Sequence, residues 1–89
     1  MNNVVVKYFS ATWCGPCKSM KPGMEDLKKE GYPIEFLDVE ENKELASNAG
    51  VRAVPTIIIY ENNEPVETLV GAQDVERLKK KINVYYEPK

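Results

Sequence analysis

The sequence predicts an α/β protein with a single domain, residues 1–89, in which a mixed sheet of about four strands carries helices on its faces. Two patterns predict this class. Strand-like and helix-like segments alternate through the first half, and the second half has two strand-like segments joined by a polar turn before a last helix. At 89 residues the chain is too short to divide its apolar residues between two cores. The expected order is β-α-β-α-β-β-α.

The first half of the chain predicts a right-handed βαβ unit. Residues 4–9 are β-branched and aromatic, which is typical of a central strand covered on both faces. A helix is expected from about Cys14 to about Glu30, because apolar residues recur three and four positions apart and Pro16 suits a first helical turn. Residues 34–39 form the next strand, and the helical connection predicts that it runs parallel to the first.

The second half predicts a short helix, a hairpin and a closing helix. Residues 40–49 are expected to form the short helix, because Gly50 is suited to end it. Residues 56–60 and 65–70 flank a polar turn, so we expect them to pair as antiparallel strands. Asp74 is suited to cap a last helix whose apolar residues share one face.

Composition and charge exclude several functions. No apolar run approaches the ~20 residues that span a bilayer, so we do not expect a membrane protein. Twelve basic and 14 acidic residues give a formal charge of −2, which does not favour nucleic acid as a ligand. With no histidine and two cysteines, Cys-His catalysis and a four-ligand zinc site are not expected. The chain opens without a signal-like segment, so the cytoplasm is the expected location.

The chemistry is expected at Cys14-Gly15-Pro16-Cys17, where a helix begins after a strand. The first helical N–H groups and the helix dipole stabilise an anion, so Cys14 is the favoured thiolate. Cys17, one turn further and more buried, is expected to stay protonated and within reach of a disulfide. Lys18 adds positive charge to this turn or points into solvent. Two inert buried cysteines or half of a zinc site are the alternatives, and dithiol exchange is favoured over both.

Residues 9–18, Phe-Ser-Ala-Thr-Trp-Cys-Gly-Pro-Cys-Lys, resemble the active-site segment of thioredoxins. Pro22 stands where thioredoxins carry a proline inside the active-site helix. Residues 54–56, Val-Pro-Thr, resemble their cis-proline loop, and residues 70–72, Val-Gly-Ala, resemble the stretch with a glycine beside their active site. These motifs extend over most of the chain, so the resemblance implies a minimal thioredoxin fold.

The resemblance also implies a protein disulfide reductase without a bound cofactor or metal. Cys14 would attack a substrate disulfide, and Cys17 would resolve the mixed disulfide. Val54 would pair its backbone with an extended substrate segment beside a cis Pro55. A trans proline that begins a strand, and a Trp13 that only packs, are the alternatives. The expected substrate-binding surface comprises Trp13, Val54, Pro55, Gly71 and Ala72. The residues expected to support the two cysteines are Tyr8, Trp13, Gly15, Pro16, Lys18 and Pro55.

The sequence departs from the thioredoxin pattern at two buried positions. Thioredoxins usually carry an aspartate six residues before the first cysteine, and Tyr8 stands there. Phe36 stands where a lysine commonly accompanies that aspartate. Loss of both charges is consistent, because either one buried alone would be costly. The Tyr8 hydroxyl is expected either to hydrogen-bond near Cys17 or to have no proton role, with both rings only packing in the core.

The resemblance implies partners, and the sequence leaves alternatives for them. Electrons would come from an NADPH-dependent thioredoxin reductase and pass to disulfides of protein substrates, with the protein acting as a monomer. The chain begins almost at its first strand and has the size of a glutaredoxin. One alternative is therefore glutathione-dependent exchange, with Gln73 and Asp74 placed to hold glutathione. Another is an interaction module of the same fold whose redox chemistry is incidental.

Overall fold

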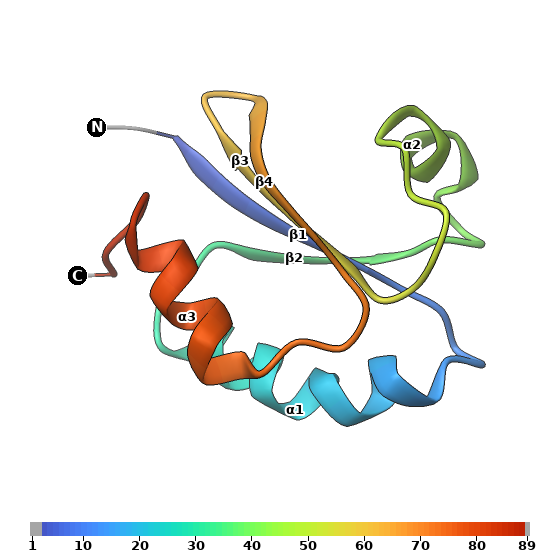
Figure 1. Ribbon diagram of the computed structural model, residues 1–89, viewed down its shortest axis with the longest axis horizontal. Helices are drawn as coiled ribbons and strands as arrows, with labels where there is room; N and C mark the ends of the chain where they lie inside the picture. The colour runs from blue at the N-terminus through green and yellow to red at the C-terminus, as the bar shows by residue number, and fades with distance from the viewer. Residues whose placement is uncertain (1–2, 89) are drawn as a thin grey trace.

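The computed structural model describes residues 3–88 and contains a mixed sheet with helices on both faces (Figure 1). The predicted order of elements is confirmed. The elements are β1 (Val4–Ser10), α1 (Gly15–Lys29), β2 (Ile34–Asp38), α2 (Lys43–Asn48), β3 (Thr56–Glu61), β4 (Glu64–Val70) and α3 (Val75–Asn83). Within residues 3–88, no helix has both the length and the apolar character that crossing a bilayer requires.

The sheet has the strand order β2-β1-β3-β4, so β1 is a central strand as predicted. β1 runs parallel to β2 and antiparallel to β3, with Tyr8 opposite Phe36 on one side and Ile57 on the other. β3 and β4 form the expected antiparallel hairpin. Asn62 and Asn63 turn it with positive φ angles of 53° and 69°, a backbone conformation that asparagine tolerates well.

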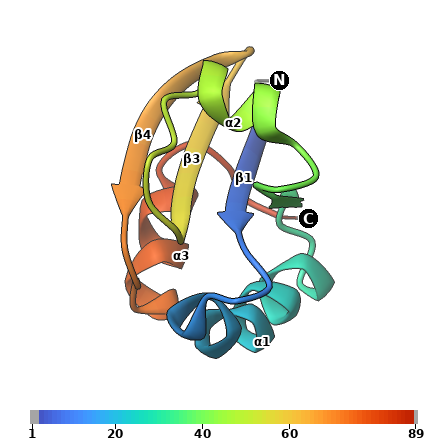
Figure 2. The same ribbon diagram turned by 90° about the vertical axis from the view of Figure 1, so that its right-hand side faces the viewer.

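The two faces of the sheet are covered unequally. α1 and α3 lie together on one face and α2 lies on the other, as Figures 1 and 2 show. The larger core packs alternate residues of β1 against the apolar stripes of the two longer helices, because side chains of a strand alternate between the faces. A smaller cluster under α2 contains Phe9, Ala46 and Ile58. The larger core fixes the position of α1, whose first turn carries both cysteines.

Two segments differ from the sequence prediction. The short helix expected over 40–49 covers only Lys43–Asn48, because the Asp38 carboxylate accepts a hydrogen bond from the N–H of Glu40 at 2.8 Å and holds a turn there. Tyr85 and Tyr86 belong to the C-terminal tail that follows α3, which no sequence pattern placed. Both pack against the larger core. The tail therefore contributes to the fold.

The end of α1 is tied to α3 and the tail by contacts between residues far apart in the sequence. The Tyr32 hydroxyl donates to Asn83 Oδ1 at 2.6 Å, and the Tyr86 hydroxyl donates to the Gly31 carbonyl at 3.1 Å. Lys79 Nζ lies 2.8 Å from Glu30 Oε1, and this exposed ion pair adds little on its own. These contacts hold the far end of the helix that begins at the cysteines.

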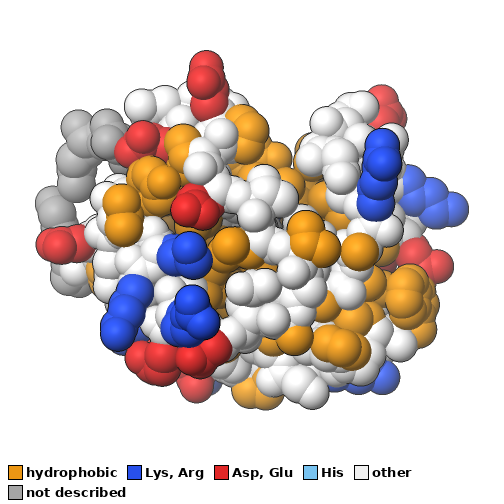
Figure 3. All heavy atoms as spheres, viewed as in Figure 1, with side chains coloured by type: hydrophobic (Ala, Val, Ile, Leu, Met, Phe, Trp, Pro, Cys, Tyr) orange, Lys and Arg blue, Asp and Glu red, His pale blue; other side chains and the backbone are white. Residues whose placement is uncertain are grey.

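The space-filling view separates charged from apolar surface. Figure 3 shows Lys, Arg, Asp and Glu side chains gathered over α3, and hydrophobic side chains exposed near the connection from β1 to α1. The large hydrophobic side chains that are exposed include Trp13 in this connection and Val70 at the end of β4. Apolar surface is thus available close to the cysteines.

Gly23 lies where α1 approaches α3, and its replacement tests this contact. A Cβ at this position would lie 2.7 Å from Val75 Cγ2, too close for both to keep their places. We expect Gly23→Ala to lower the free energy of unfolding by about 1 kcal/mol, because overpacking costs about 1–3 kcal/mol and alanine regains about 1 kcal/mol of helix propensity. Urea denaturation measures the change.

Gly15→Ala is the matched control, because no atom lies within 4 Å of the Cβ it would add. Its free energy of unfolding should equal or exceed that of the unchanged protein. A Gly23→Ala protein as stable as the Gly15→Ala protein would show that the two helices do not meet closely at this position.

Candidate active site

Cys14 occupies the N-cap of α1, with φ −88° and ψ 112°, just before the first helical residue, Gly15. Its Sγ accepts a hydrogen bond from the backbone N–H of Cys17 at 3.2 Å, and its carbonyl accepts from the N–H of Lys18, also at 3.2 Å. Pro16 stands in the first turn, where a missing N–H costs the helix nothing. The sulfur of Cys14 therefore occupies the position at which a helix stabilises negative charge.

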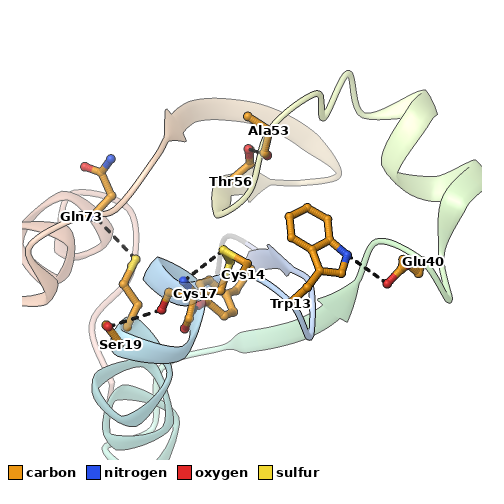
Figure 4. Close-up of a disulfide and its surroundings, with 11 residues drawn as sticks. Trp13, Cys14, Cys17, Ser19, Glu40, Ala53, Thr56 and Gln73 are labelled. Carbon is orange, nitrogen blue, oxygen red and sulfur yellow. Dashed lines mark hydrogen bonds between the residues drawn. A yellow bond between two sulfur atoms is a disulfide. The ribbon is translucent and has the colours of Figure 1, made fainter.

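The two cysteines form a disulfide, with their Cα atoms 5.3 Å apart. Figure 4 shows this bond at the start of α1, with Trp13 beside it. The exposed fractions are 5% for Cys14 and 3% for Cys17, so the two residues are buried almost equally in the oxidised protein. Across residues 3–88, no group of three or more His, Cys, Asp or Glu side chains is placed to hold a metal ion.

The disulfide packs against apolar residues from three separate segments. Ala11 precedes it in the chain, Val39 follows β2, and Val54 comes from the loop before β3. The peptide bond between Val54 and Pro55 is cis. The N–H of Gly71 donates to the Pro55 carbonyl at 2.8 Å, which places the end of β4 beside this loop. Val54, Pro55 and Gly71 therefore meet near the cysteines, although they are distant in the sequence.

The remaining predicted site residues differ in exposure. Trp13 is 67% exposed, and Ala72 and Lys18 are also exposed. Pro55 is fully buried, so its ring lies under the surface rather than on it. Ala72 follows Gly71 at the edge of this region and is not part of the apolar cluster around the cysteines. The exposed apolar surface nearest the disulfide is thus supplied mainly by Trp13, with Val54 partly exposed beside it.

Trp13 has a polar partner that the sequence analysis did not find. Its indole Nε1–H donates to Glu40 Oε1 at 3.1 Å, across 27 positions of the chain (Figure 4). The indole also forms one wall of a shallow hollow of about 180 Å³. The other residues that line the hollow are Val39, Val51, Arg52, Ala53 and Val54. Nothing local marks Glu40 as a partner, because β2 and the following turn must fold before it reaches the indole.

Tyr8 lies under the first turn of α1. Its hydroxyl donates to the carbonyl oxygen of Cys17 at 2.7 Å, and its ring meets the ring of Phe36 edge to face at 5.7 Å between centroids. Lys28 Nζ lies 5.5 Å from the centre of the Phe36 ring. Burial raises the pKa of the Tyr8 hydroxyl above its ordinary value, so this group remains neutral at physiological pH. Tyr8 thus both packs in the core and hydrogen-bonds to Cys17.

The arrangement of the cysteines supports one kind of reaction. When this disulfide is reduced it gains two electrons and becomes a dithiol. The dithiol passes the electrons to another disulfide by exchange. The fold and this dithiol define a thiol–disulfide oxidoreductase.

Comparison with known proteins identifies the family. The Thioredoxin family model matches residues 1–84. Thioredoxin of Listeria monocytogenes is 39% identical over 85 residues, which cover 92% of this chain and 82% of that protein. Thioredoxin of Bacillus subtilis is 41% identical over 83 residues, covering 90% of this chain and 80% of that protein. The chain belongs to the thioredoxin family.

A solved structure agrees with this assignment. A mutant thioredoxin from Halobacterium salinarum superposes with a TM-score of 0.90 at 43% identity, covering 99% of this chain and 79% of that chain. The α/β fold expected from the resemblance is confirmed. Cys14 and Cys17 occupy the Cys-x-x-Cys position of the family, and the protein is a thiol–disulfide reductase. Membership of this family implies disulfide substrates and a thioredoxin reductase in general terms.

The bond between Trp13 and Glu40 predicts a measurable restraint on the indole. Trp13 is the single tryptophan, so its fluorescence reports on this residue alone. In Glu40→Ala the indole N–H loses its acceptor, a hydrogen bond worth ~0.5–1.5 kcal/mol. Because this bond restrains the ring, we expect the amplitude of the fast local motion of the indole to rise about twofold. The decay of fluorescence anisotropy measures it. Glu41→Ala is the control, and an equal rise in that variant would contradict the prediction.

Proposed function

We propose that Cys14 is the attacking thiolate and Cys17 the resolving thiol in the reduction of disulfides on protein substrates. The observation that carries this assignment is the hydrogen bond from the N–H of Cys17 to Cys14 Sγ. A negative sulfur at this position gains from that bond and from the helix dipole, whereas the sulfur of Cys17 lies inside the first turn. The asymmetry between the two cysteines therefore comes from their places in the helix rather than from their similar burial.

The substrate disulfide is reduced in two thiol–disulfide exchange steps. The Cys14 thiolate attacks one sulfur of the substrate disulfide, forms a mixed disulfide and releases the other substrate sulfur as a thiolate, which takes a proton from water. Cys17 then loses its proton and attacks Cys14 Sγ. The intramolecular disulfide forms, the bond to the substrate breaks, and the second substrate thiolate leaves. The substrate gains two electrons, and the protein ends in the oxidised form that the structure shows.

An extended polypeptide fits the surface beside Cys14. Within residues 3–88, the backbone N–H and C=O of Val54 make no hydrogen bond, so a substrate strand could pair there. The exposed indole of Trp13 and the hollow beside it offer apolar contact to side chains of that strand. A substrate of this kind would present its disulfide in an accessible, extended segment.

The electron donor, location and oligomeric state belong to the same proposal. An NADPH-dependent flavoprotein thioredoxin reductase would return the Cys14–Cys17 disulfide to the dithiol, as membership of the family supports. We place the protein in the cytoplasm, where reducing conditions keep a dithiol ready to attack. We expect it to act as a monomer, because each chain carries both cysteines and the loop beside them.

Replacing each cysteine separately tests the assignment of roles. Cys17→Ser should still attack a peptide that contains one disulfide, but the mixed disulfide should accumulate because no resolving thiol remains. Cys14→Ser should form less than about a tenth as much adduct, since its remaining thiol does not occupy the helix N-cap. Mass spectrometry of the intact protein, after quenching with acid, measures both. Adduct formation that is faster in Cys14→Ser than in Cys17→Ser would reverse the assignment.

The reduction potential of the Cys14–Cys17 couple separates the proposed function from glutathione-dependent exchange. We expect a value clearly more negative than about −200 mV, where the range of glutaredoxins begins. Equilibration in buffers with defined ratios of reduced to oxidised glutathione, followed by thiol alkylation, gives this value without a cognate partner. A potential at or above −200 mV would move the assignment to glutathione-coupled exchange or disulfide donation.

A further inference from the structure

One backbone hydrogen bond of α1 is missing next to Cys17, between residue 22 and the carbonyl of residue 18. Pro22 lies inside the helix and has no N–H to donate to the carbonyl four residues earlier, which belongs to Lys18. The proline ring also crowds that carbonyl. The turn that carries Cys17 is therefore held less firmly by the helix itself than a turn without proline would be.

Tyr8 supplies a bond from outside the helix at this place. β1 is a central strand with neighbours on both sides, so the ring of Tyr8 projects from a rigid support. The ring is fully buried and is held edge to face by Phe36. Its hydroxyl donates to the Cys17 carbonyl at 2.7 Å, and a carbonyl can accept this bond as well as a helical one because it has two lone pairs.

We propose that Tyr8 is a positioning residue for the resolving step: its hydroxyl anchors the backbone of Cys17 so that the thiol is aligned with the sulfur of Cys14. The proposal rests on the assignment of Cys17 as the resolving thiol. Attack on a disulfide requires the incoming sulfur to approach close to the line of the bond that breaks, so a small displacement of the Cys17 backbone slows the step. Attack by Cys14 on the substrate precedes this step. It uses the N–H of Cys17 but not the direction of the Cys17 thiol, so it depends less on this alignment.

The surroundings of Cys17 point to positioning rather than proton transfer by Tyr8. The Tyr8 hydroxyl donates its hydrogen to a backbone carbonyl, not to a sulfur. The apolar residues packed around the cysteine pair are Ala11, Val39 and Val54, and the nearest charged residue in α1 is the exposed Lys18. The Glu40 carboxylate, beyond β2, bonds the indole of Trp13 rather than a cysteine. The proton of Cys17 therefore passes to water or to the leaving substrate thiolate, and the thiols alone determine the pH dependence of resolution.

An aromatic disulfide whose thiolate absorbs visible light separates the two steps. Mixed in excess with the reduced protein, it releases one thiolate during attack, at a rate proportional to its concentration. It releases the second during resolution, at a rate independent of that concentration. We expect Tyr8→Phe to slow the second phase by about three- to tenfold, as for the loss of one neutral hydrogen bond, and to change the first phase by less than about twofold. The pH midpoint of the second phase should not move.

Tyr32→Phe is the matched control. It also removes the hydroxyl of a buried tyrosine from a hydrogen bond. This bond is part-buried and lies beyond the opposite end of α1, where the partner is Asn83. Both phases should keep their rates in this variant. Urea denaturation measures the free energy of unfolding of both variants, and we expect similar losses. A second phase that is slower in Tyr8→Phe but not in Tyr32→Phe then reports the alignment of Cys17 rather than lost stability.

Pro22→Ala provides a rescue test, because residue 22 regains an N–H for the Lys18 carbonyl. Combined with Tyr8→Phe, it should restore the second phase to within about twofold of the unchanged protein.

Four results would overturn the proposal. They are a second phase in Tyr8→Phe within about twofold of the unchanged protein, equal slowing in Tyr32→Phe, no rescue by Pro22→Ala, and a shifted pH midpoint, which would assign Tyr8 a proton role. Absence of both phases in the unchanged protein would instead contradict the proposed function.

Discussion

The N–H of Cys17 points at the sulfur of Cys14, and the rest of the structure serves to keep that bond in place. A helix N-terminus stabilises negative charge only within its first turn, so the sulfur must sit at the N-cap and the turn must be intact. β1, buried between two neighbouring strands, delivers the chain to this point, and α1 begins one residue after Cys14. Reactivity thus follows from where a buried strand ends and a helix starts.

The position of α1 depends on contacts along its whole length. Its apolar stripe packs against β1 and α3, and the missing side chain of Gly23 lets Val75 approach closely. At its far end, Tyr32 and the tail residue Tyr86 make hydrogen bonds that join this end to α3 and the chain beyond it. These contacts hold α1, and with it the two cysteines at its start, in one position.

Within residues 3–88, the buried core beneath the cysteines contains no charged side chain. Tyr8 and Phe36 are neighbours across β1 and β2 and form an edge-to-face ring contact at the two positions where the thioredoxin pattern implies a buried acid and base. An ion pair at this depth needs both partners, since either charge alone would carry a large desolvation penalty. The hydroxyl of Tyr8 keeps one polar contact with the redox site, through the Cys17 carbonyl.

Local patterns in the sequence determined the order of elements and the place of Cys14 at a helix start, because periodicity and capping act over a few residues. The shorter α2 escaped prediction because the Asp38 side chain bonds the backbone of the following turn. Only the tertiary structure decided that Glu40 reaches Trp13, that the Tyr8 hydroxyl meets the Cys17 carbonyl, and that the tail packs on the core. These contacts join residues that the chain brings together only after the sheet has formed.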